Sequence, residues 1–176
     1  MTRVPGIELH VGDITRLDVT AIANAANEAL APGGGVCGAI FRAAGPELVG
    51  ECRALGGCPT GECRLTQGHG LKANWILHCV GPVWHGGGRG EAALLASCYR
   101  SALEIAAQRH FESVAFPAIS TGIFGYPPAD AARIAVGAVH DHLAAHDWPK
   151  RVILVAYDEG AARPLRAALA AAMQGG

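Results

Sequence analysis

The stretch AFPAISTGIFGYPPADAARIAVGAVHDHLAAH, residues 115–146, decides the fold class of this chain. It joins an apolar, β-rich segment to a loop of small and hydroxyl residues, and then to a helical segment that begins at Pro128. Proline suits a first helical turn, because the N–H group that it lacks would be unpaired there. A buried strand that leads through such a loop into a helix indicates an α/β protein.

The rest of the 176-residue chain repeats this alternation. The predicted strands are 7–12, 20–25, 64–68, 75–81, 113–119 and 151–157. The predicted helices are 37–45, 46–55, 91–110, 128–146 and 160–173. We therefore expect one domain over residues 1–176, with helices on both faces of a mixed sheet. In such sheets ligands bind beyond the carboxyl ends of the strands, so the loops there carry the functional analysis.

Composition excludes several classes of protein. Hydrophobic residues make up 51% of the chain and charged residues 16%, which excludes a disordered chain, and the apolar runs are too short to span a bilayer. The first ten residues, MTRVPGIELH, lack a signal-peptide core, so we expect a cytoplasmic protein without a membrane partner. With 14 basic and 15 acidic residues and no basic run, no long nucleic acid is expected as a partner.

The six cysteines are expected to be free thiols rather than a disulfide set. Cys52, Cys58 and Cys63 with His69 raise the possibility of zinc, but their spacing lacks the paired C-x2-C of common structural sites. No metal is expected.

The segment GGGVCG, residues 33–38, fits the G-x-G-x-x-G pattern of dinucleotide-binding enzymes. That fingerprint requires a strand directly before the first glycine, whereas NEALAP precedes it here. Glu51 and Glu62 also lie off the spacing expected for the ribose-binding acid. The hypothesis of a nicotinamide oxidoreductase is therefore weaker than the two functions considered below. Glycines before a helix can still bring backbone N–H groups to an anion.

A second loop, residues 120–125, offers another anion site. Ser120 and Thr121 carry hydroxyls, Gly122 and Gly125 allow close backbone approach, and Phe124 supplies either an apolar wall or core packing.

Polar and aromatic residues follow three other strands. Asp13 suits either a helix cap or a hydrogen bond from an adenine amino group. Asn27 suits either a turn or a pair of ribose hydroxyls, and Tyr157 either the core or stacking on a base.

Taken in order, GDIT (12–15), NAAN (24–27), GGGVxGAIxRAAGP (33–46), VGPVW (80–84) and SVAFPAISTGIFGYP (113–127) resemble the macrodomain family. The resemblance is to its MacroD-type branch, which processes ADP-ribose esters. It implies a three-layer α/β/α fold with a central mixed sheet and an ADP-ribose cleft across one edge.

The resemblance also implies a set of site residues. Asp13 and Ile14 would meet the adenine and Tyr157 would stack on it, while Asn27 would contact the distal ribose. The diphosphate and distal ribose would be lined by Gly35, Val36, Gly38, Ser120, Thr121, Gly122, Ile123 and Phe124. The catalytic set would be Asn27, Gly35 and Cys37, without metal or cofactor.

The implied reaction is hydrolysis of the ester that joins ADP-ribose to Asp or Glu side chains of modified proteins, or of O-acetyl-ADP-ribose, by a water that the substrate diphosphate helps to position. The chain departs from the family pattern at Cys37, where an Asp is usual, and at Phe41, where a His is usual. A thiol is a weak hydrogen-bond acceptor and does not replace a carboxylate. The second hypothesis is therefore an ADP-ribose reader with weak or no hydrolase activity.

Overall fold

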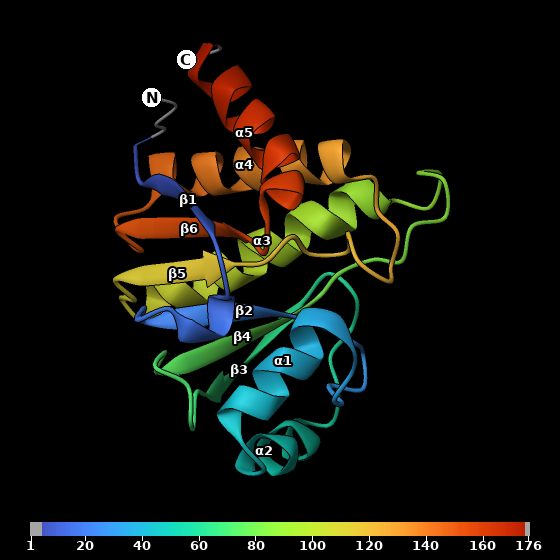
Figure 1. The fold of residues 1–176 in the computed structure, drawn as a ribbon, viewed down its shortest axis with the longest axis vertical. Helices are drawn as coiled ribbons and strands as arrows, with labels where there is room; N and C mark the ends of the chain where they lie inside the picture. Colours follow the sequence, from blue (N-terminus) through green and yellow to red (C-terminus); the bar gives the residue numbers. More distant parts are fainter. Residues whose placement is uncertain (1–4, 175–176) are drawn as a thin grey trace.

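The computed structural model describes residues 5–174 and contains a six-stranded sheet in the order β1-β6-β5-β2-β4-β3 (Figure 1). The strands are β1 (Ile7–Val11), β2 (Ala21–Ala26), β3 (Cys63–Gln67), β4 (Trp75–Val80), β5 (Ser113–Phe116) and β6 (Arg151–Ala156). Neighbouring strands run parallel except β3 and β4, which are antiparallel. The predicted mixed sheet is confirmed.

Within residues 5–174, five α-helices and one short 3-10 helix lie between or after the strands. They are η1 (Ile14–Arg16), α1 (Gly35–Ala44), α2 (Glu47–Leu55), α3 (Glu91–Gln108), α4 (Pro128–Ala145) and α5 (Glu159–Gln174). Every predicted helix and strand is present, and most ends lie within two residues of the prediction. The strand predicted over 113–119 was too long: β5 ends at Phe116, because Pro117 has no N–H group to continue the ladder.

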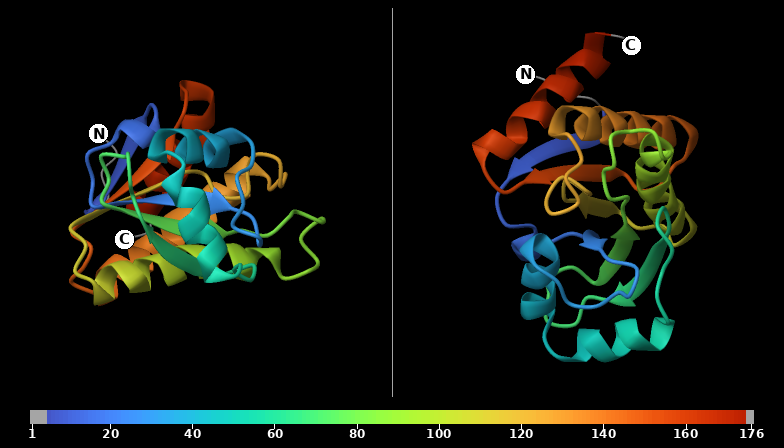
Figure 2. Two further views of the ribbon diagram at one scale, coloured as in Figure 1. Left: turned by 90° about the horizontal axis from the view of Figure 1, so that it is seen from below. Right: turned by 90° about the vertical axis from the view of Figure 1, so that its right-hand side faces the viewer.

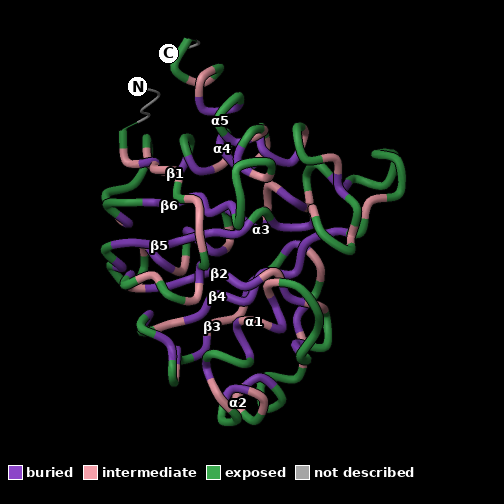
Figure 3. The backbone as a smooth tube through the Cα atoms, in the orientation of Figure 1, coloured by how far each residue is buried: buried purple, intermediate pink, exposed green. Residues whose placement is uncertain are grey.

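The helices lie in two layers with the sheet between them (Figure 2). Helices α1 and α2 pack on one face, and α3, α4 and α5 on the other, each layer closing its own apolar cluster. Because both faces are covered, strands such as β6 are apolar along nearly their whole length. Figure 3 shows these strands as buried tubes and the connecting loops as exposed ones. The fold is the expected three-layer α/β/α arrangement.

None of the helices within residues 5–174 is both long enough and apolar enough to cross a membrane.

Candidate functional site

Five parallel strands end at one edge of the sheet, and a predicted site residue or loop follows four of them. Across the sheet the order is Asp13 after β1, Tyr157 after β6, the β5–α4 loop (residues 117–127), the β2–α1 loop (residues 27–34) and Gly81 after β4. Neighbouring strands lie about 4.8 Å apart, so the three steps from β1 to β2 span roughly 14 Å. The edge therefore presents a row of groups suited to an elongated ligand.

At the β1 end, Asp13 caps the short helix η1. Its Oδ1 accepts from the Thr15 N–H group at 2.9 Å and from the Thr15 hydroxyl at 2.7 Å. These two bonds, with Arg16 nearby, hold the pKa of the Asp13 carboxyl below its ordinary value. The carboxylate is thus an ionised hydrogen-bond acceptor at neutral pH.

Tyr157 and Ile14 are the other two residues predicted to contact the adenine. Gly12 N–H donates to the Ala156 carbonyl at 2.8 Å, which brings Asp13 and Tyr157 to neighbouring positions on the edge. Tyr157 is 82% exposed, so its ring is accessible to a planar group. The Ile14 side chain is buried in the core, and only its main chain could reach a ligand.

The β5–α4 loop is held in shape by its own hydrogen bonds. Tyr126 N–H donates to the Ser120 carbonyl at 2.9 Å, and the Thr121 hydroxyl donates to the Ala118 carbonyl at 2.8 Å. The Thr121 hydroxyl is therefore engaged within the loop, although the sequence favoured it as a donor to the ligand. The Ser120 Oγ atom is buried and has no hydrogen-bond partner in the described chain.

Three consecutive N–H groups of this loop remain available. Those of Gly122, Ile123 and Phe124 donate to no atom of residues 5–174. The carbonyl of Phe124 accepts from Trp84 N–H at 2.8 Å, which ties the segment to the loop after β4. A run of fixed, unpaired amide donors favours an anionic ligand.

The β2–α1 loop is closed by Asn27. Its Nδ2 donates to the Ala31 carbonyl at 2.9 Å, and its Oδ1 accepts from Ala31 N–H at 3.0 Å. A Cβ on Gly33 would lie 3.7 Å from both Asn27 Nδ2 and Cys37 Sγ, so the predicted catalytic residues Asn27 and Cys37 both border this glycine. Both side chains also approach the Ala31 carbonyl, which sequence reasoning alone could not show.

Helix α1 begins directly after this loop. Gly35 has a φ of +56°, which L side chains rarely adopt, and a Cβ on Gly38 would lie 2.5 Å from the Gly33 carbonyl oxygen. The N–H groups of Gly35, Val36 and Cys37 have no partner within residues 5–174, as is usual in a first helical turn. The positive end of α1 thus points to the sheet edge.

The two loops face each other. A Cβ on Gly34 would lie 3.6 Å from Ile123 Cδ1, which is ordinary van der Waals contact. The Ile123 side chain is nevertheless 88% exposed. Together the loops form a cradle of amide donors with Ile123 at its rim.

Sequence reasoning missed three residues that shape the site from behind. Asn24 in β2 and His78 in β4 are both fully buried, and Asn24 Nδ2 lies 3.1 Å from His78 Nδ1. Glu91 is almost fully buried and accepts from the N–H groups of His85, Gly87 and Arg89, which fixes the loop after β4. A polar residue inside an apolar run, as in AIANAA and WILHCV, is the signal that could have found the first two.

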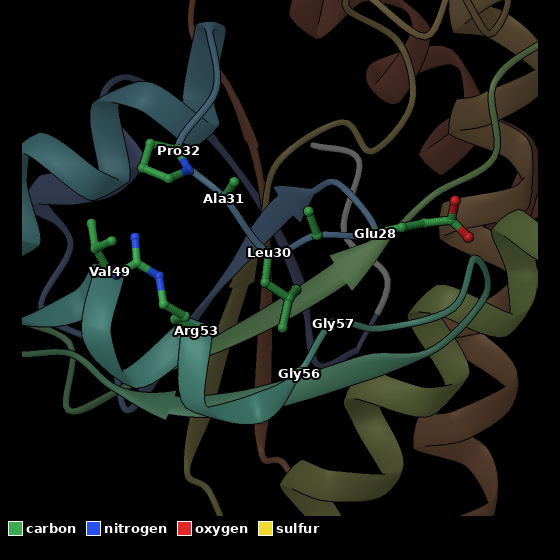
Figure 4. Close-up of a pocket in the computed structure, with 9 residues that line it drawn as sticks. Glu28, Leu30, Ala31, Pro32, Val49, Arg53, Gly56 and Gly57 are labelled. Atoms are coloured by element: carbon green, nitrogen blue, oxygen red, sulfur yellow. The ribbon is translucent and has the colours of Figure 1, made fainter.

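A cavity of about 290 Å³ lies beside the β2–α1 loop, between that loop and the end of α2 (Figure 4). Arg53 extends toward Pro32 at its wall, while the Glu28 carboxylate points away and accepts from Thr60 at 3.3 Å. None of the predicted site residues lines this cavity. The cavity therefore lies on the α2 side of the β2–α1 loop and does not include the predicted site residues.

All six cysteines are buried free thiols. Cys37 is 5% exposed, and its Sγ lies 3.7 Å from the Ala31 carbonyl. Phe41 is buried beside His78, with the ring centroids 6.4 Å apart, so it packs in the core below the cradle.

The amino-acid sequence is similar to those of known macro domain proteins. Residues 23–135 match the family model described as Macro domain. The chain is 55% identical over 169 residues to a macro domain-containing protein of Mesorhizobium japonicum, covering 96% of each chain. It is 51% identical over 161 residues to a Salmonella gallinarum protein named O-acetyl-ADP-ribose deacetylase, covering 89% of this chain and 90% of that one.

Solved structures show the same likeness. A variant of the Oceanobacillus iheyensis macrodomain with ADPR superposes with a TM-score of 0.92 at 38% identity, covering 96% of this chain and 94% of that one. The Trypanosoma brucei macrodomain in complex with ADP-ribose superposes with a TM-score of 0.87 at 40% identity, covering 92% and 68%.

Proposed function

Because this chain belongs to the Macro domain family, we propose that it binds ADP-ribose along the carboxyl edge of its sheet and hydrolyses ADP-ribose esters. The observation that carries the proposal is the order of groups along that edge. An acceptor and an open aromatic ring at one end, amide donors in the middle and an asparagine at the other end match adenine, diphosphate and distal ribose in sequence.

In the proposed pose, the Asp13 carboxylate accepts from the adenine amino group and Tyr157 stacks on the base. The diphosphate receives hydrogen bonds from the N–H groups of the β5–α4 loop and of the first turn of α1. These backbone donors explain how a chain with net charge -1 can hold a dianion without a basic cluster. Ile123 covers the diphosphate from the rim.

The proposed reaction is addition of water across the ester at the distal ribose. Water supplies a proton and a hydroxyl group, the ester C–O bond breaks, and the products are ADP-ribose with a free hydroxyl and a free carboxylic acid. The protein contributes orientation, since Asn27 and the loop glycines hold the distal ribose while the substrate diphosphate lies near the water. The substrates are O-acetyl-ADP-ribose and, as the finer proposal, Asp- or Glu-linked ADP-ribose on modified proteins.

A second function, ADP-ribose recognition without turnover, is favoured by one observation. Cys37, which borders Gly33 together with Asn27, carries a buried thiol 3.7 Å from the Ala31 carbonyl, and a thiol is a weak hydrogen-bond acceptor. The nearest acid along the chain, Glu28, points away from the cradle. A site of this kind would retain affinity while losing rate.

The two functions are separated by incubating the protein with O-acetyl-ADP-ribose and, separately, with a glutamate-linked mono-ADP-ribosylated protein, and following product release. Hydrolysis predicts multiple turnovers, and recognition alone predicts calorimetric binding of ADP-ribose with no release. The variant N27A should lose most of the turnover, because it removes the residue proposed to hold the distal ribose.

The matched control is N74A, at an exposed asparagine just before β4, near the opposite edge of the sheet. It should retain the rate and affinity of the natural chain. Absence of both ADP-ribose binding and turnover in the natural chain would overturn the proposed function altogether.

A further inference from the structure

A chain of polar side chains crosses the buried side of the sheet directly beneath the cradle. Asn24 in β2, His78 in β4 and Thr66 in β3 are 0%, 0% and 1% exposed. Asn24 and His78 are register partners on neighbouring parallel strands. Burial of three polar groups under an apolar helix is costly unless each one is hydrogen-bonded, so their arrangement calls for a reason.

The Asn24 amide nitrogen sets the direction of the hydrogen bonds in this chain, because an amide nitrogen can only donate. It donates to His78 Nδ1 at 3.1 Å. Burial lowers the pKa of His78 to about 4, so the ring is neutral and its one proton lies on Nε2. That proton is donated to the Thr66 hydroxyl at 2.9 Å, and the hydroxyl donates in turn to the Gln67 carbonyl at 3.2 Å.

His78 thereby holds the amide nitrogen of Asn24 in place. One amide hydrogen is donated to His78, and the same nitrogen lies 3.7 Å from Cys37 Sγ. The Asn24 Oδ1 atom is buried and accepts no hydrogen bond within residues 5–174. The Asn24 side chain thus directs a donor at residue 37. This orientation leaves its Oδ1 atom without a hydrogen bond, which costs free energy in a buried site.

We propose that Asn24 is a positioning residue: held by His78, it presents an N–H donor to the side chain at residue 37 and sets how that side chain meets the distal-ribose end of the cleft. The inference rests on the proposed function. A thiol accepts this donor weakly, whereas a carboxylate at the same place would accept it strongly. Asn24 and His78, which lie behind residue 37, therefore suit a stronger hydrogen-bond acceptor than the Cys37 thiol.

The first test measures the pKa of the carboxyl group that C37D introduces, by NMR titration of protein labelled with carbon-13 in its Asp side chains. A carboxylate that accepts from Asn24 titrates at or below its ordinary value of about 3.9. A value raised well above that by burial would overturn the proposal. This measurement requires neither substrate nor turnover, so it stands even where the proposed function fails.

The second test is a double-mutant cycle between C37D and N24L, in which Leu has a similar volume and no donor. We expect C37D to raise kcat at least tenfold when Asn24 is present and less than threefold beside N24L, with KM and the ADP-ribose Kd changed less than threefold. Equal gains in both backgrounds would overturn the proposal, because a purely structural Asn24 gives additive effects.

The control for the cycle is N74L, the same replacement at an exposed asparagine outside the polar chain. It should preserve most of the C37D gain. If N24L fails to unfold cooperatively in urea, the carboxyl pKa of C37D with Asn24 present decides the question alone.

Discussion

Gly81, at the end of β4, lies so close to Ser120 of the β5–α4 loop that a side chain at residue 81 would overlap the Ser120 hydroxyl. The same Cβ would lie 2.6 Å from Ile119 Cγ2. The loop that supplies the central amide donors is therefore seated directly on the neighbouring loop after β4. The position of the β5–α4 loop therefore depends on the absence of a side chain at residue 81.

Substitution of Gly81 by Ala should consequently destabilise the protein by about 1–3 kcal/mol, the usual cost of overpacking a closed site. Urea denaturation gives the free energy of unfolding. G88A is the matched control, since a Cβ there meets nothing within 4 Å, and its effect should stay within about 0.5 kcal/mol. Equal effects of the two variants would contradict the close packing.

Removal of the exposed ring in Y157A should weaken ADP-ribose binding by about 1–3 kcal/mol, the range found when an aromatic that stacks on a base is replaced by Ala. The free energy of unfolding should hardly change, because the ring is 82% exposed. Calorimetric titration with ADP-ribose measures the affinity. Y157F retains the ring and should bind as the natural chain does; unchanged affinity in Y157A would refute the stacking.

His78 should make the protein less stable as the pH falls. Burial lowers its pKa in the folded state to about 4 from 6.5, so between these values the unfolded chain binds a proton that the folded chain does not. The contribution of neutral His78 is present above pH 6.5 and declines as the pH falls toward 4, by about 3 kcal/mol in total.

Urea denaturation at several pH values tests this effect. The variant H78Q should show a shallower loss of stability across that window than the natural chain. H140Q alters an exposed histidine and should leave the slope unchanged. Parallel curves for H78Q and the natural chain would exclude His78 as the group responsible.

Glu91 should control the mobility of the loop after β4. Its carboxylate accepts three N–H groups, and these bonds lower its pKa to about 2. E91Q loses the charge and one of its acceptor oxygens, so the amides of Gly87 and Arg89 should exchange faster with deuterium. The same amides in E104Q, an exposed change on the same helix, should exchange at the natural rate; equal rates in E91Q would remove Glu91 from this role.

The sequence determined the elements and their approximate bounds. The signals are local ones: apolar runs such as RVILVA, proline at the start of α4, and glycines between segments. Such signals are enough to predict which segments form helices and which form buried strands. The main error, the end of β5, came from reading an apolar run through Pro117. Candidate ligand residues were also found locally, since they follow strand ends.

The tertiary structure alone decided which of these residues meet. Asn27 and Cys37 border the same glycine only because α1 packs against β2, and Ile123 reaches Gly34 only because β5 and β2 are neighbours in the sheet. Asn24 and His78 are 54 residues apart, and no local pattern relates them. Pairing between distant strands is set by the global packing of both sheet faces, so the donor beneath Cys37 is a property of the fold and not of any single segment.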